Sequence, residues 1–273
     1  MNYELKRTNP KSMLNKGTGF LAGYTHSLNP YTGCSFACSY CYVRRMPVAM
    51  FRQQEWGSWV DAKGQAAELL RRELVRAKGK GPVTIFMSSS TDPYQPAEHK
   101  EGVTRSLLAA MREEPPDFLL VQTRSPLVTR DIDLLQALGS RVRVSMTIET
   151  DLEAIRKHFT PYAPPIGGRL KALRLLKEAG IPTQATIAPL LPSSESFPQL
   201  LRGIADRICI DNYELGDGSG GKRTRSLGIA ALYEELGMQQ WYESSACKLL
   251  YDRFTDVFPA DKVLISQEGF APG

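Results

Sequence analysis

Short apolar segments alternate with amphipathic helical segments along most of this 273-residue chain. Apolar runs typical of buried strands occupy residues 83–87, 118–121, 141–146, 182–187, 207–210 and 263–265. Helical patterns occupy residues 61–78, 98–112, 131–138, 150–158 and 169–179. Strands that alternate with helices form a parallel sheet with crossover helices, so the chain is predicted to adopt an α/β fold.

The number of strand–helix units predicts an incomplete barrel. About six units fit between residues 23 and 215, whereas a complete TIM barrel has eight. We therefore predict a partial, TIM-like (β/α)6 barrel of parallel strands in residues 23–215. A basic segment, 1–22, precedes it, and a short α-rich extension, 216–273, is expected to close the barrel. Thr150 and Glu153 match a capping box, which predicts a helix start at this point.

Three of the five cysteines lie close together in a loop that also contains glycine and serine. Cys34, Cys38 and Cys41 have the spacing CxxxCxxC. Three thiolates can bind three irons of a four-iron cluster and leave the fourth iron open to another molecule. An open metal position is typical of a catalytic site, whereas a structural site is closed. The motif therefore predicts a [4Fe-4S] cluster as the metal site.

Other interpretations of the cysteines stay open at this stage. His26 precedes Cys34 by eight residues, so a zinc site with three cysteines and one histidine is an alternative, as in a metal-knuckle protein that binds nucleic acid. An electron-transfer iron–sulfur protein is a third class, although such proteins normally use four cysteine ligands. Cys209 lies in an apolar run and is expected to be buried, and Cys247 is isolated in the sequence.

Composition and charge limit the kinds of partner that the protein is expected to bind and the compartment in which it is expected to lie. Apolar residues make up 42% of the chain, but no run of about 18 apolar residues indicates a membrane span. The N-terminus is polar and basic, without the apolar segment of a signal peptide, so we expect a reducing, cytoplasmic location. The whole net charge of +5 comes from residues 1–60, which contain seven basic and two acidic residues. This basic segment favours an anionic partner such as nucleic acid.

Four of the predicted strands are followed by loop segments, three of which are rich in polar side chains. They are Ser88–Glu98, Gln122–Pro126, Thr147–Glu149 and Ala188–Pro192. Parallel barrels carry their active sites at the C-terminal ends of the strands. We therefore expect these segments to meet beside the cysteine loop.

Three runs in these loops narrow the class further. Together with the cysteine motif, Asn29–Cys34, Thr91–Glu98 and Thr123–Asp131 resemble the spore photoproduct lyase-related family of radical S-adenosylmethionine (SAM) enzymes, whose members are also described as DNA repair photolyase-like. The resemblance extends from about Lys11 to Pro192, roughly two thirds of the chain. The family also has a partial barrel, in agreement with the strand count.

The resemblance implies a reaction. In this family a [4Fe-4S] cluster cleaves SAM reductively, and the resulting 5′-deoxyadenosyl radical abstracts a hydrogen atom from the substrate. DNA repair of the spore photoproduct lyase kind is the implied activity, with a small metabolite or a peptide as the alternative substrate. An electron donor such as flavodoxin or ferredoxin is implied as a partner. The cofactor supplies the radical chemistry, while the protein orients it and excludes water.

The same resemblance assigns roles to single residues. Cys34, Cys38 and Cys41 would bind the cluster. The implied SAM contacts are Tyr40 and Ala188 for the adenine, Ser89, Ser90, Thr91 and Asp92 for the amino group, Arg124 for the carboxylate, and Ser145 for the ribose or carboxylate. A guanidinium suits a carboxylate because it offers paired donors and a permanent charge.

One position departs from the family pattern. Spore photoproduct lyases carry a cysteine beside the SAM-binding serine after the second strand, as the hydrogen-atom donor that completes their reaction. This chain has serines at 88–90, and a hydroxyl is a poorer hydrogen-atom donor than a thiol. The candidates for this catalytic role are therefore Cys209, Cys247 and Tyr213, and the substrate is left open.

Overall fold

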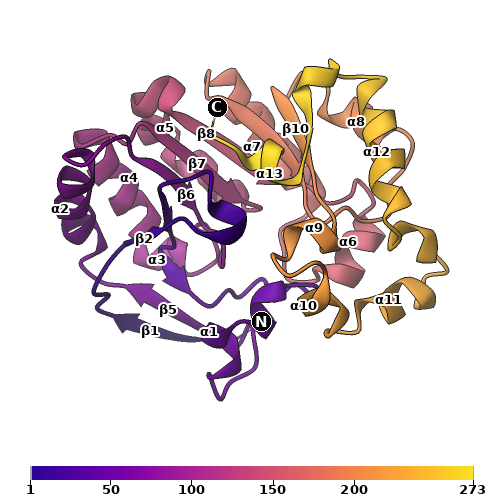
Figure 1. The fold of residues 1–273 in the computed structure, drawn as a ribbon, viewed down its shortest axis with the longest axis horizontal. Coiled ribbons are helices and arrows are strands. Elements are labelled where there is room, and N and C mark those ends of the chain that lie inside the picture. Colours follow the sequence, from indigo (N-terminus) through magenta and orange to yellow (C-terminus); the bar gives the residue numbers. More distant parts are fainter. Residues whose placement is uncertain (1, 273) are drawn as a thin grey trace.

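The computed structural model describes residues 2–272 and contains a twisted sheet of eight strands with helices packed around it (Figure 1). The strands are β2 (Leu14–Lys16), β3 (His26–Leu28), β6 (Thr84–Met87), β7 (Phe118–Thr123), β8 (Val142–Thr147), β9 (Thr183–Ile187), β10 (Arg207–Ile210) and β11 (Val263–Ile265). Their order is β11–β10–β9–β8–β7–β6–β3–β2, and each pairing is parallel apart from that of β2 with β3. The predicted α/β fold with a partial parallel barrel is confirmed.

The helices bury regularly spaced apolar side chains. They are α1 (Pro47–Met50), α2 (Ala66–Lys78), α3 (Glu98–Glu101), α4 (Val103–Glu113), α5 (Ile132–Leu138), α6 (Glu153–Phe159), α7 (Ile166–Glu178), α8 (Phe197–Leu201), α9 (Tyr213–Gly216), α10 (Lys222–Arg225), α11 (Ile229–Glu235), α12 (Ser245–Thr255) and α13 (Ser266–Phe270). Leu70 and Leu74 of α2 are fully buried, because residues four apart share one face of a helix. The helix predicted over 98–112 is divided at Gly102, whose φ of +61° is a left-handed conformation that ends α3.

A second, smaller sheet has the order β1–β5–β4. It consists of β1 (Glu4–Thr8), β4 (Tyr31–Thr32) and β5 (Trp59–Lys63). The prediction of a helix from residue 61 is therefore wrong for residues 61–63. Trp59 and Val60 are buried in β5, and the acidic Asp61 forms an ion pair with Arg52 at 2.7 Å. The pairing of β5 with β1 and β4 therefore outweighs the helical composition of residues 61–63. Because β4 leads directly into Gly33, this sheet supports the cysteine loop.

The predicted capping box at Thr150 does not form. The helix α6 begins at Glu153, and its N-cap position is Leu152. The hydroxyl of Thr150 accepts a hydrogen bond from the Leu152 amide at 3.0 Å and donates to the Pro192 carbonyl at 2.6 Å. Thr150 therefore ties the loop after β8 to the loop after β9, and this long-range bond displaces the local cap.

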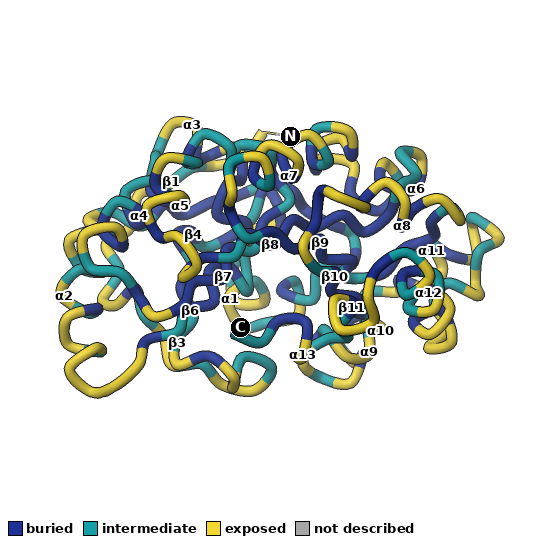
Figure 2. Tube along the Cα trace, turned by 90° about the horizontal axis from the view of Figure 1, so that it is seen from above, coloured by how far each residue is buried: buried dark blue, intermediate teal, exposed yellow. Residues whose placement is uncertain are grey.

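The C-terminal segment completes the sheet on one side. β11 pairs in parallel with β10, and α12 and α13 pack against these strands. Burial is concentrated in the central strands, whereas the outer loops and outward helix faces are exposed (Figure 2). Within residues 2–272, none of the helices combines the length and apolar character needed to span a bilayer.

Candidate active site

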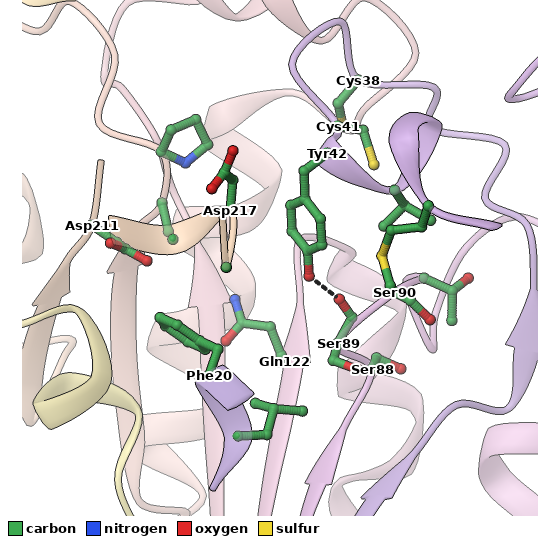
Figure 3. A pocket seen from close by; sticks show the side chains of 18 of the residues that line it. Phe20, Cys38, Cys41, Tyr42, Ser88, Ser89, Ser90, Gln122, Asp211 and Asp217 are labelled. Atoms are coloured by element: carbon green, nitrogen blue, oxygen red, sulfur yellow. Dashed lines mark hydrogen bonds between the residues drawn. The ribbon is translucent and has the colours of Figure 1, made fainter. Parts of the chain in front are cut away.

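A cavity of about 550 Å³ lies where the parallel strands end. Its strand-end lining residues are Ser88–Asp92 after β6, Gln122–Arg124 at the end of β7, Thr147 at the end of β8, Ala188 and Pro189 after β9, and Asp211–Tyr213 after β10. Cys34, Cys38 and Cys41 also line it. Figure 3 shows two of these cysteines on the same side of the cavity as Ser88–Ser90, with Asp211 on the opposite side. The structure therefore brings the cysteine motif and the strand-end segments into one site.

The cysteine loop is held by a conformation that only a small residue allows and by one buried amide. Gly33 has a φ of +83°, and a Cβ atom there would lie 2.5 Å from the Trp59 carbonyl oxygen. The Gln95 side chain is fully buried and forms hydrogen bonds with the backbone of the loop. Its amide nitrogen donates to the Gly33 carbonyl at 3.1 Å, and its oxygen accepts from the Ser35 amide at 3.0 Å. The backbone of the loop is thus held by Gln95 and by its close packing on Trp59.

Burial makes the three thiols weak acids in the absence of a metal. It raises the pKa of Cys34, and it raises the pKa of Cys41 to about 11. It also raises the pKa of Cys38, although the Arg124 guanidinium opposes this shift. A bound cation would favour the thiolates, because cysteine ligands bind metals in their deprotonated form.

The three thiols are the ligand set of a cluster with one open iron, because all of them line the same cavity. His26, the fourth ligand of the zinc alternative, lines a different surface pocket together with Glu73 and Lys80. An iron–sulfur cluster assigns each cysteine its own iron, so the three thiols need not converge on one point. The donor set of one cavity and three separate thiols fits that group.

Arg124 connects the cysteine loop to the strand ends. Its Nη1 atom lies 3.0 Å from Cys38 Sγ, 3.1 Å from the Tyr40 hydroxyl and 2.6 Å from Glu149 Oε1. The Tyr40 hydroxyl donates a second bond to the same Glu149 oxygen at 2.5 Å. The other Glu149 oxygen accepts from Arg169 Nη1 at 2.6 Å. The Glu149 carboxylate therefore positions the Arg124 guanidinium through one oxygen and binds Arg169 through the other.

The charge state of Glu149 follows from these contacts. Burial alone would raise the pKa of this carboxyl, but Arg124 and then Arg169 outweigh burial and lower the pKa to about 2. Glu149 is consequently ionised at neutral pH. A buried carboxylate with two guanidinium partners is a rigid charged element.

Asp92 fixes the backbone of the same region. Its Oδ1 atom accepts from the Tyr94 amide at 2.9 Å and from the Thr123 hydroxyl at 2.7 Å. Its Oδ2 atom accepts from the Arg124 amide at 2.8 Å. Burial raises the pKa of Asp92, and the hydrogen bonds from Arg124, Thr123 and Tyr94 oppose the rise. The carboxylate thus ties the loop after β6 to the end of β7.

Most of the residues that the resemblance assigned to SAM line this cavity. They are Tyr40, Ser89, Ser90, Thr91, Asp92, Arg124 and Ala188. The Ser89 carbonyl accepts a bond from the Tyr42 hydroxyl at 2.6 Å (Figure 3). The Thr91 hydroxyl donates to the Gly33 carbonyl at 2.6 Å, so it also supports the cysteine loop.

Ser145 is not brought to the cavity. It is fully buried, and its hydroxyl lies within hydrogen-bond distance of the side chains of Thr186 and Gln184. Residues two apart on a strand point to the same face, and Thr147, nearer the strand end, lines the cavity instead. Ser145 therefore does not line the cavity, and its contact with SAM stays a prediction.

The three candidate hydrogen donors differ in their access to the cavity. Tyr213 lines the cavity, and its hydroxyl lies 3.0 Å from that of Tyr233. Cys209 is buried beneath α13, close to Gly269, and Cys247 is buried on α12. The cavity lining includes neither of these two cysteines.

Several site residues had no individual role assigned from the sequence. Gln95 and Glu149 lie in segments that were expected at the site, whereas Arg169 was missed. All three act through contacts with residues that are distant in the chain. Asp211, in the cavity wall after β10, was also missed, although its place at a strand end was a signal that could have found it.

The fold and the site together define a partial-barrel enzyme with a three-cysteine loop in the wall of its strand-end cavity. The chain belongs to the radical SAM superfamily, whose family model matches residues 28–202. An uncharacterized protein of Methanocaldococcus jannaschii is 34% identical over 172 residues, which cover 63% of this chain and 62% of that protein. An uncharacterized protein of Acidianus two-tailed virus is 31% identical over 207 residues, which cover 70% of this chain and 67% of that protein. The match spans less than two thirds of the length of the first of these relatives.

The same fold occurs in a solved structure. A mutant of spore photoproduct lyase with bound AdoMet and dinucleoside spore photoproduct is similar with a TM-score of 0.67 and 15% identity. The similarity covers 96% of this chain and 81% of that chain. The predicted membership of the radical SAM enzymes and the predicted fold are therefore both confirmed.

Proposed function

We propose that Cys34, Cys38 and Cys41 hold a [4Fe-4S] cluster and that SAM binds in the adjoining cavity. The observation that carries this proposal is the convergence of all three motif thiols and Arg124 on one cavity. A cluster held by three cysteines would supply an open iron to SAM and the electron that cleaves it to methionine and a 5′-deoxyadenosyl radical.

The chain's own residues would bind and orient SAM. Arg124 offers a permanent positive charge for the carboxylate group, and Asp92 and Glu149 hold its backbone and side chain in place. The backbone after β6 offers carbonyl acceptors for the amino group. Phe20 and Phe270 contribute apolar surface to the cavity, which would limit the access of water to a radical.

For the substrate we propose a nucleic acid or a nucleotide-like anion, with repair of DNA photoproducts as the leading activity. The family motifs and the fold shared with a spore photoproduct lyase that binds a dinucleoside photoproduct support this choice. Lys16 and Arg223 lie in the cavity wall and would attract a phosphate. A small metabolite or a peptide is the alternative. Flavodoxin or ferredoxin in a reducing cytoplasm is the electron donor we expect.

Tyr213 is our candidate for the hydrogen donor, because it lines the cavity whereas Cys209 and Cys247 do not. Its O–H bond would break to return a hydrogen atom to the substrate radical, and the tyrosyl radical left behind would be reduced by one electron from the flavodoxin or ferredoxin and a proton from solvent. Its contact with Tyr233 offers a second phenol to share the oxidation.

Anaerobic reconstitution with iron and sulfide tests the cofactor proposal. After addition of SAM and dithionite, 5′-deoxyadenosine is quantified for the wild type, for Cys38→Ala, and for Cys247→Ala as a cysteine control outside the cavity. We expect about four irons and product in the wild type and the control, and neither in Cys38→Ala. A protein with a full cluster that forms no 5′-deoxyadenosine would contradict the proposal.

Substrate class is tested in the same assay. DNA that contains the spore photoproduct, undamaged DNA and a peptide mixture are each added to the reconstituted enzyme. Stimulation of 5′-deoxyadenosine formation by damaged DNA alone, with loss of the photoproduct, is the expected result. Stimulation by peptides alone would instead favour the alternative.

A further inference from the structure

Arg124, Glu149 and Arg169 form a buried array of ion pairs, and Arg124 also contacts the Cys38 sulfur. Arg124 comes from the end of β7, Glu149 follows β8, and Arg169 belongs to α7, so the array joins three consecutive strand–helix units. Arg169 is fully buried and also donates to the Thr147 carbonyl at 3.1 Å. Its Nη2 atom has no partner. Burying these three charged groups costs desolvation free energy, which their mutual contacts offset in part.

The contact that gives the array a role is the one between Arg124 Nη1 and Cys38 Sγ, at 3.0 Å. A thiolate accepts such an N–H bond, and the guanidinium places a positive charge beside the sulfur. Both effects stabilise the more negative, reduced state of a cluster bound to that sulfur. Hydrogen bonds to the sulfurs and local charge are two of the factors that set cluster potentials.

The rest of the array keeps this charge in position. Glu149 would neutralise Arg124 if it were its only partner, but Arg169 shares the carboxylate from the other side. Besides Glu149, Asp92 is a carboxylate that acts on Cys38. Of Arg124 it contacts the backbone amide and not the guanidinium. The side chain of Arg124 is thus oriented by Glu149 and remains available as a donor to the cysteine.

We infer that Arg124 raises the reduction potential of the cluster through its bond to the Cys38 sulfur, and that Glu149, clamped by Arg169, is the positioning residue for this contact. This inference rests on the proposed function, since it presupposes a cluster on the motif cysteines. It assigns Arg124 a role toward the cysteine sulfur in addition to the proposed contact with the SAM carboxylate.

Potentiometric titration of the reconstituted protein in the absence of SAM tests the inference. The cluster is followed by its electron paramagnetic resonance signal in the wild type, Arg124→Gln, Arg124→Lys and Arg143→Gln. Arg143 is a partly buried arginine of β8 that stacks on Phe118 and serves as the matched control. We expect Arg124→Gln to lower the one-electron reduction constant at least about tenfold, a shift of about 59 mV, with Arg124→Lys between it and the wild type. The control should keep the wild-type potential.

A double-mutant cycle tests the part of Glu149. The shift caused by Arg124→Gln is measured in the wild type and in the Glu149→Gln background. If Glu149 positions Arg124, the shift shrinks in that background, whereas equal shifts would overturn the positioning role. An unchanged potential in Arg124→Gln with a full cluster would overturn the inference as a whole. Failure of the wild type to take up iron and sulfide would count against the proposed function instead.

Discussion

At the scale of single residues, Asp211 is a buried carboxyl group without an ionic partner among residues 2–272. It lies in the cavity wall after β10 and accepts from the Asn212 amide at 3.0 Å. Burial raises its pKa to about 7, although hydrogen bonds from Ser266 and Asn212 oppose the rise. The folded protein therefore keeps a proton on this group over a range in which the unfolded chain has lost it.

Asp211→Asn should remove a pH dependence of stability. Since the folded pKa is raised, the wild-type contribution is fully present below about pH 4 and is lost as pH rises through about 7. The loss is on the order of 4 kcal/mol in the free energy of unfolding, and Asp211→Asn should lack it. Urea titrations from pH 4.5 to 8 measure the difference between the two proteins. A difference that does not change with pH would show that Asp211 is ionised throughout this range.

At the scale of elements, the cysteine loop depends on the strand that lies beneath it. Gly33 has a φ of +83°, and a side chain there would meet both the backbone and the indole ring of Trp59 in β5. The loop and the small sheet are therefore one structural unit. The sequence predicted the loop's chemistry, but it did not predict β5, because the partners of that strand are β1 and β4, far away in the chain.

Gly33→Ala should uncouple the loop from β5. We expect a loss of about 1–3 kcal/mol in the free energy of unfolding, from backbone strain and from the clash with Trp59, together with reduced iron uptake. Gly139→Ala is the control, because its φ of +58° is also positive but no atom lies within 4 Å of the added carbon. Thermal unfolding and iron analysis separate the two. Normal iron content in Gly33→Ala would mean that the loop adapts without β5.

At the scale of the whole molecule, the C-terminal segment joins the two edges of the barrel. The Tyr24 hydroxyl donates to the Phe270 carbonyl at 2.6 Å, and Gln267 donates to the Phe20 carbonyl at 3.0 Å. On the other side, Arg207 donates to the Gly269 carbonyl at 2.7 Å. The segment thus bridges β10 and the loop before β3.

Gly269→Val should open this closure. A Cβ atom at Gly269 would overlap the Cys209 sulfur, so α13 must move away from β10. Cys209 is 0% exposed, and we expect its alkylation by a maleimide to accelerate at least about tenfold, with weaker SAM binding as Phe270 leaves the cavity wall. Gly23→Ala is the control, since its nearest contact would be an ordinary 3.8 Å from Pro272. Peptide mass spectrometry identifies the labelled cysteine, and equal rates in the two variants would argue against closure by α13.

The extent of sequence-based prediction also follows from these contacts. The strands were predictable because each is a continuous apolar run, and the site was predictable where residues follow a strand end, as Asp92 and Arg124 do. Ser145 does not line the cavity, whereas Thr147, two residues nearer the end of the same strand, does, so the contact of Ser145 with SAM stays a prediction. Arg169 was missed because its pattern on α7 is that of a surface residue, while its partner Glu149 lies in a different unit. Local patterns do not encode such pairings.

The tryptophans beside the cysteine loop have an optical consequence. Trp56 and Trp59 lie edge to face, with ring centroids 5.8 Å apart. Cys34 and Cys41 pack against the small hydrophobic core that these two rings form with Val43. Iron–sulfur centres absorb light across the near ultraviolet and visible range, so a cluster in the loop would accept excitation energy from both indoles. The third tryptophan, Trp241, lies in the C-terminal part of the chain. Tryptophan fluorescence would therefore report what fraction of the molecules in a sample carries the proposed cluster.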